Sequence, residues 1–267
     1  MEKKRARLMF RFIARKTTLI IGILAIAVPM VAMAASMVNS KHDLSNLNAR
    51  AVAKGGVPAM EGVTYNDYGD VCVYCHTPHN YSGPAFSNIA PMWNRVTPQV
   101  GNYSPYASST LDSSVGQPDR ESLACLSCHD GTIAVDAIHA RPTTGWVDAG
   151  AHYKMNSQEC GKCHGGAGGA RGAVGGAHDA TIKYIGQDLR GTHPVSMNYP
   201  SPSADPQFNT PGPNGTFSTG VKLFSGKVQC PSCHDPHFAD ENNAEGRNPF
   251  LRAPNRGSAL CVTCHIK

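Results

Sequence analysis

Cys72-Val-Tyr-Cys75-His76 is the first of five C-x-x-C-H motifs in this chain of 267 residues. The others are Cys125-Leu-Ser-Cys128-His129, Cys160-Gly-Lys-Cys163-His164, Cys230-Pro-Ser-Cys233-His234 and Cys261-Val-Thr-Cys264-His265, and together the five contain all 10 cysteines. In this pattern two thiols can form thioethers to the vinyl groups of one porphyrin, and the adjacent imidazole can bind its iron. The sequence therefore predicts five covalently bound haem c groups, with His76, His129, His164, His234 and His265 as proximal ligands.

Two other uses of paired cysteines fit the pattern less well. Zinc sites of four thiolates would need an even number of pairs, and they do not require a histidine after each pair. Disulfides within such close pairs would close very small loops and stabilise little. The histidine that follows every pair favours haem.

The amino terminus is typical of a Sec signal peptide. Seven basic residues precede an apolar run from Leu19 to Val28, and Ala32-Met33-Ala34 offers a cleavage site. An uncleaved anchor is the alternative, although Pro29 interrupts the apolar stretch. We expect residues 1–34 to be removed, so that the membrane is contacted only through the leader. Residues 35–267 are then expected to form a single pentahaem domain, exported to the outside of the cell or the cell surface, with the periplasm as the alternative.

The positive charge of the whole chain belongs to this leader. Residues 35–267 contain 17 basic and 18 acidic residues, a net charge of about −1, whereas the full chain carries +5. Nucleic acid is therefore not an expected partner, because its binding rests on clustered positive charge.

Composition predicts a multihaem fold with little regular secondary structure. The chain contains 27 glycines and 19 prolines, and residues 165–176 are mostly glycine and alanine. We expect mostly coil with short helices and a small β-hairpin, wrapped around a haem stack that supplies much of the apolar core. One helix should begin near Asp119 and carry Cys125 to His129, and another should follow Gly257. The hairpin is predicted over residues 221–229, turning at Ser225-Gly226.

The remaining histidines decide what the haems can do. Seven are left for the second axial positions: His42, His79, His139, His152, His178, His193 and His237. His79 and His237 each stand three residues after the histidine of a motif, in His76-Thr-Pro-His79 and His234-Asp-Pro-His237. Each is too close in sequence to reach the opposite face of its own porphyrin, so each should bind a neighbouring haem. His193, His42 and His178 are the next candidates, and His152 and His139 are harder to place.

Methionine is the alternative sixth ligand and would raise the haem potential. Outside the leader the candidates are Met37, Met60, Met92, Met155 and Met197. Because histidines are in surplus, we expect bis-histidine ligation. Such haems have no open position, so they transfer electrons and bind no substrate.

The motifs and their flanks resemble a known group. Seven segments occur in this order: His42-Asp-Leu-Ser45, Cys72-Val-Tyr-Cys-His-Thr-Pro-His79, Met92-Trp-Asn94, Ala124-Cys-Leu-Ser-Cys-His-Asp-Gly-Thr132, Asp188-Leu-Arg-Gly-Thr-His-Pro-Val-Ser196, Cys230-Pro-Ser-Cys-His-Asp-Pro-His237 and Asn248-Pro-Phe-Leu251. As a set they resemble small multihaem c-type cytochromes of metal-reducing bacteria, some of which form extracellular cytochrome filaments (nanowires). The most similar members carry four haems. The motif at Cys160, with His152 and His178 around it, therefore looks like a one-haem insertion near residues 150–180.

The resemblance implies an electron carrier, not an enzyme. Its partners would be other multihaem cytochromes, as donors or acceptors, and further copies of the chain in a homopolymer. In filament-forming relatives a histidine of one subunit completes a haem of the next, and His42 is the candidate for that role. The alternatives are a soluble periplasmic pentahaem shuttle and a multihaem reductase, which would need an open iron.

Overall fold

A computed structural model of the chain describes residues 37–38, 40, 42–45, 66–77, 92–142, 185–238 and 250–266. These residues belong to one compact unit, Ala35–Lys267. The predicted leader, the third motif, His79, His152 and His178 lie outside the described residues, so these predictions stay predictions. None of the helices in the described ranges is long and apolar enough to cross a membrane.

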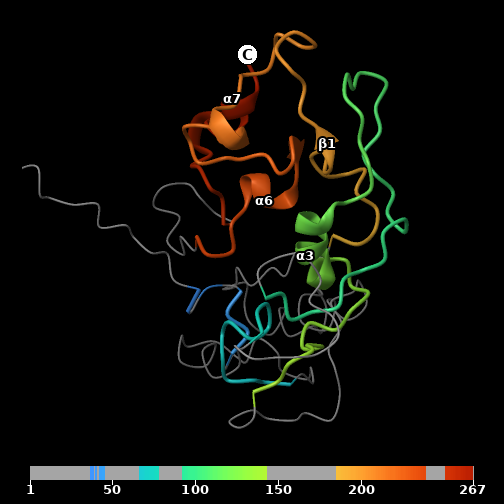
Figure 1. Cartoon of the computed structure of the whole chain (residues 1–267), viewed down its shortest axis with the longest axis vertical. Helices are drawn as coiled ribbons and strands as arrows, with labels where there is room; N and C mark the ends of the chain where they lie inside the picture. The colour runs from blue at the N-terminus through green and yellow to red at the C-terminus, as the bar shows by residue number, and fades with distance from the viewer. Residues whose placement is uncertain are drawn as a thin grey trace, which may run out of the picture. The chain divides into compact units, whose positions relative to one another are not determined.

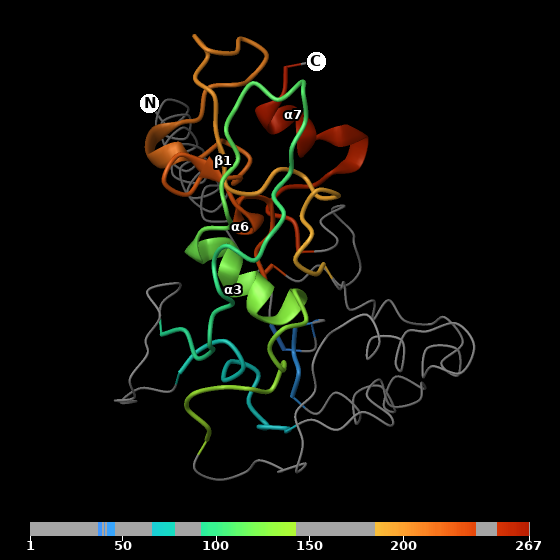
Figure 2. The same cartoon turned by 90° about the vertical axis from the view of Figure 1, so that its right-hand side faces the viewer.

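Most of the described chain is coil. Its helices are α3 (Arg120–His129), η1 (Pro213–Gly215), α6 (Cys230–Cys233), η2 (Arg256–Ser258) and α7 (Cys261–Cys264), and its strands are β1 (Met197–Asn198) and β2 (Lys227–Val228). Figures 1 and 2 show these short elements joined by long loops. The predicted fold class, mostly coil with short helices and a small antiparallel β element, is confirmed.

The two predicted helices are confirmed. α3 begins directly after Asp119, whose extended backbone is that of an N-cap residue, although its side chain makes no capping hydrogen bond. Leu123 and Leu126 lie on its buried face, where they pack with Tyr103 and Leu189. α7 follows the turn η2 and carries the last motif.

The hairpin predicted over residues 221–229 is confirmed at its turn, Ser225-Gly226, but residues 221–224 form no strand and meet β2 in a single bridge, Phe224 with Lys227. Phe224 and Lys227 exchange two backbone hydrogen bonds of 2.9 Å, and the two turn residues have φ angles of 50° and 76°. Positive φ at both positions is typical of a two-residue hairpin turn. β2 then pairs antiparallel with β1, Met197 opposite Val228, a long-range pairing that the sequence did not indicate.

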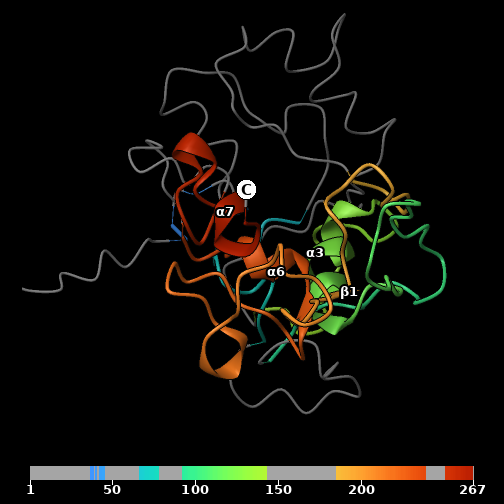
Figure 3. The same cartoon turned by 90° about the horizontal axis from the view of Figure 1, so that it is seen from above.

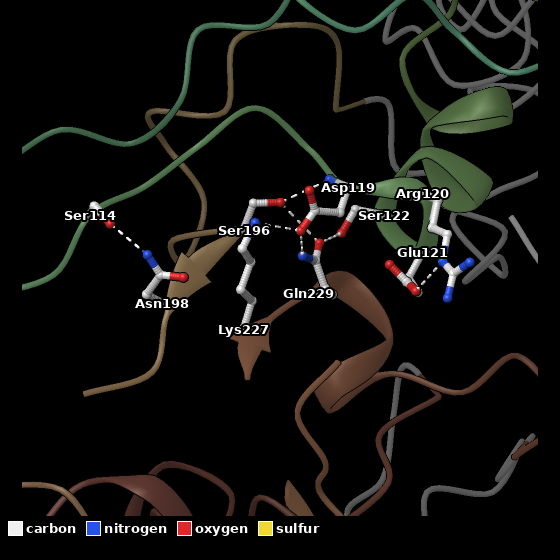
Figure 4. Close-up of polar contacts among 9 residues, drawn as sticks. All are labelled: Ser114, Asp119, Arg120, Glu121, Ser122, Ser196, Asn198, Lys227 and Gln229. Atoms are coloured by element: carbon white, nitrogen blue, oxygen red, sulfur yellow. Dashed lines mark hydrogen bonds and ion pairs between the residues drawn. The ribbon is translucent and has the colours of Figure 1, made fainter. Parts of the chain in front are cut away.

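A polar network joins α3 to α6 (Figure 4). Gln229, which is 2% exposed, accepts hydrogen bonds from the hydroxyls of Ser122 and Ser196 and donates to Asp119 at 2.9 Å. The Ser122 hydroxyl also accepts a hydrogen bond of 3.0 Å from the backbone N–H of Cys230. Cys230 is the first residue of α6 and Ser122 lies in the first turn of α3, so this hydrogen bond holds the second and fourth motifs together.

Candidate haem-binding sites

Each described motif folds as one helical turn. The backbone N–H of His76 donates to the carbonyl of Cys72 at 2.8 Å, and the corresponding bonds are 3.1 Å in the fourth motif and 3.0 Å in the fifth. The second motif lies inside α3. Residues i, i+3 and i+4 of a helical turn share a face, so both thiols and the imidazole are available to one porphyrin.

Three of the motifs are fixed by the same backbone clamp. The proximal histidine forms an isolated antiparallel bridge: His76 with Trp93, His234 with Leu251 and His265 with Phe208. In the first and fourth motifs the residue before the bridge partner, Met92 or Phe250, has a φ angle near +55°. The clamp thus fixes the backbone on both sides of each of these histidines.

In the described part of the chain, a cysteine of each motif lies close enough to a cysteine of the next motif to affect its pKa. Burial raises the pKa of Cys75 to about 12, with Cys128 of the next motif adding to the shift. A hydrogen bond between the Cys125 and Cys230 thiols raises the pKa of Cys125 and lowers that of Cys230. Burial and then Cys264 raise the pKa of Cys233 to about 11. The described motifs thus lie in the order first, second, fourth, fifth, and in Figures 1, 2 and 3 α6 lies between α3 and α7.

Three of the proximal histidines face a second imidazole. The ring centroids are 6.2 Å apart for His76 and His237, 6.1 Å for His129 and His42, and 6.5 Å for His265 and His193. The ring of His237 thus lies beside His76 of the first motif, and its binding to the haem there stays a prediction. The predicted partner of His234, His79, lies outside the described residues.

These separations fit an iron between the rings. A metal–imidazole bond is about 2.0 Å and the ring centre lies about 1.1 Å further, so two axial imidazoles have centroids roughly 6.3 Å apart. Two buried polar atoms beside His76, the indole nitrogen of Trp93 and the hydroxyl of Thr77, have no hydrogen-bond partner in the described structure. Buried polar atoms need a partner, and the propionate carboxylates of a bound haem would supply acceptors. The residues therefore fit haem c.

His42 is the most buried of the second imidazoles. Burial, followed by the neighbouring His129, His234 and His237, lowers its pKa to about 4. Its ring packs against Phe250, with centroids 4.3 Å apart. The imidazole is therefore neutral at physiological pH, which is the form that binds iron.

The other described candidates are placed differently. His139 is bound through its backbone N–H to the carbonyl of Asn94, and within the described ranges it forms no ring pair with a proximal histidine. Met197 is 5% exposed inside an apolar cluster with Phe217 and Val221, where it serves as a core residue. Reasoning from the sequence missed Asp235, which contacts His237, and Arg252, which contacts Asp235. The only sequence signal for them was the histidine two residues after Asp235.

Comparison with known proteins gives one family match. Residues 223–267 match the doubled CXXCH motif family. No curated protein matches the chain. The match indicates a multihaem c-type cytochrome. The matched part of the chain contains the fourth and fifth motifs with α6 and α7, and motifs of this kind indicate covalently bound haem c. The match thus supports a role in electron transfer.

Proposed function

We propose that the chain is an electron carrier with five covalently bound, bis-histidine haems. The observation that carries the proposal is the set of three imidazole pairs, each with one ring from a C-x-x-C-H motif and centroids 6.1, 6.2 or 6.5 Å apart. An iron held between two imidazoles has no position for substrate, so it can only gain and lose an electron. The succession of motifs from Cys75 to Cys264 supports transfer from one haem to the next.

The same reasoning extends to the two remaining haems. His79 stands after the first motif as His237 stands after the fourth. Since His237 faces His76, we propose the reciprocal pair of His79 with His234. For the haem at Cys160 and Cys163, His178 is the proposed second ligand, with His152 as its alternative.

Carbon monoxide tests the closed coordination, because it binds reduced haem only where an axial position is open. We expect the spectrum of the reduced, haem-loaded protein to be unchanged by carbon monoxide. His42→Ala should open one haem of the five, whereas His139→Ala should leave all of them closed. A wild-type protein that binds carbon monoxide would contradict the proposal and favour a reductase.

We further propose that the carrier is an extracellular filament subunit that passes electrons to external acceptors. The support is the resemblance to filament-forming cytochromes and the position of His42 near the mature amino terminus. In the structure His42 faces His129 of its own chain. In a filament the same pair would form between two subunits if residues 37–45 of one subunit bound to the next, so that His42 of one chain faced His129 of its neighbour.

A soluble periplasmic shuttle is the second candidate, and the pairing of His42 with His129 inside one chain favours it. Electron microscopy of the haem-loaded protein from periplasmic and sheared extracellular fractions distinguishes the two. Filaments of uniform width, lost in His42→Ala and kept in His139→Ala, would support the filament. Discrete particles confined to the periplasm would contradict it and support the shuttle.

A further inference from the structure

The three second imidazoles differ in what their Nδ1 atoms contact. Nδ1 of His237 lies 2.9 Å from the Asp235 carboxylate. Nδ1 of His193 is 3.3 Å from the backbone carbonyl of Pro194, and Nδ1 of His42 has no hydrogen-bond partner in the described structure. A ligating histidine binds the metal through one nitrogen, and the group on its other nitrogen sets the tautomer and the basicity of the ring.

The carboxylate of Asp235 is fixed on both sides. Its Oδ1 accepts hydrogen bonds from the ring and from the backbone N–H of His237, the latter at 3.0 Å. Its Oδ2 is 2.8 Å from Nη1 of Arg252, whose Nε donates to the carbonyl of Pro231 at 2.7 Å. The side chains of Asp235 and Arg252 are 15% and 13% exposed, so the pair is largely shielded from water.

The backbone clamp of the fourth motif brings this pair together. The N–H of Asp235 donates to the carbonyl of Phe250 at 2.7 Å, and the N–H of Arg252 donates to the carbonyl of Cys233 at 2.8 Å. In the first motif the position equivalent to Asp235 is occupied by Thr77. The backbone clamp therefore does not require a carboxylate at this position. Among the three second imidazoles, only that of His237 has a carboxylate at its Nδ1 atom.

We propose that Asp235, held by Arg252, is a positioning residue that lowers the reduction potential of the haem attached at Cys72 and Cys75. Its carboxylate accepts a hydrogen bond from the Nδ1–H of His237, which leaves Nε2 free to bind the iron and makes the ring a stronger electron donor. A stronger donor stabilises ferric over ferrous iron. This inference rests on the proposed pairing of His237 with His76.

The test is a spectroelectrochemical titration of the haem-loaded mature protein. Asp235→Asn preserves the shape of the side chain and removes its charge. We expect the midpoint potential of one of the one-electron steps to become more positive by about 59 mV, which corresponds to a roughly tenfold change in its equilibrium constant. His237→Met should move the same step further in the same direction, since methionine ligation raises the potential.

Asp112→Asn is the matched control, because it removes one negative charge from an exposed side chain. The proposal is overturned if Asp235→Asn titrates like Asp112→Asn, if it shifts all steps equally, or if it moves a different step from His237→Met. The coordination of the wild type is read separately, by carbon monoxide. A closed wild type with an unshifted Asp235→Asn rejects only the role of Asp235, whereas an open wild type rejects the proposed function.

Discussion

Arg95 is a fully buried cation bound by neutral oxygens. Its guanidinium donates to the hydroxyl of Ser127 at 3.0 Å and to three backbone carbonyls, those of Ser127, Ala134 and Val135. These carbonyls belong to the loop after α3 and to the helix itself, so the side chain holds the segment that follows the second motif. Its charge also acts on the Cys75 thiol of the first motif.

Replacing Arg95 should destabilise the protein strongly. Arg95→Met leaves several buried carbonyl groups without donors, at about 1–3 kcal/mol for each unsatisfied group, so we expect a loss of at least about 3 kcal/mol. Denaturant unfolding followed by circular dichroism measures the change. Arg190→Met is the control: Arg190 forms an exposed pair with Asp188, so its replacement should change the free energy of unfolding little. Equal losses in the two variants would contradict the assignment.

Tyr103 gives the described structure a dependence on alkaline pH. Its hydroxyl donates to the Asp130 carboxylate at 2.6 Å, and burial together with this hydrogen bond raises the pKa of Tyr103 above its ordinary value. A raised pKa in the folded state means that the stabilisation is complete below the unfolded value of about 10 and is lost as the pH rises beyond it.

Tyr103→Phe should therefore cost about 2 kcal/mol at pH 7, the contribution of a hydrogen bond to a charged acceptor. The difference in the free energy of unfolding between Tyr103→Phe and the wild type should become smaller above about pH 10, because only the wild type must keep this phenol protonated in order to fold. Unfolding midpoints at pH 7 and pH 10.5 provide the measurement. A difference that stays constant between the two pH values would show that Tyr103 does not titrate as described.

At the scale of elements, the sequence predicted the features that depend on neighbouring residues better than the contacts between residues far apart in the chain. The helix beginning after Asp119 and the turn at Ser225-Gly226 follow from neighbouring residues, and both were found. The role of Gln229 had no local signal, since its partner Ser122 is 107 residues away. The pairing of His237 with His76 was predicted only as binding to some neighbouring haem, because the sequence does not order the motifs in space.

Gln229→Leu should loosen the joint between α3 and α6. The leucine fills similar volume but leaves the hydroxyls of Ser122 and Ser196 without their acceptor, so we expect a loss of about 2–3 kcal/mol and faster amide exchange in α3. Lys227→Met is the matched control. It removes only a partly exposed ion pair with Asp119, worth less than about 1 kcal/mol. Unchanged exchange in Gln229→Leu would rule out this network as the joint.

At the scale of the whole molecule, the apolar core is divided. Among the described residues, the buried apolar side chains form separate clusters, around Val221 and Met197, around Leu126 and Tyr103, and around Tyr68 and Tyr74. Each cluster holds few residues, and the helices that carry the fourth and fifth motifs have 4 residues each. Such short helices are not stable by themselves, so their order must come from what they bind.

Without haem, residues 35–267 should therefore form an expanded chain. For about 233 residues, a compact domain has a radius of gyration of about 17 Å and an unfolded chain about 50 Å. We expect small-angle scattering to give about 17–20 Å for the haem-loaded monomer and more than about 30 Å for the same residues produced without haem attachment. A chain with serine at Cys261 and Cys264 should lie between them, because only the last motif is left empty. A haem-free chain as compact as the loaded one would show that the small clusters suffice to fold it.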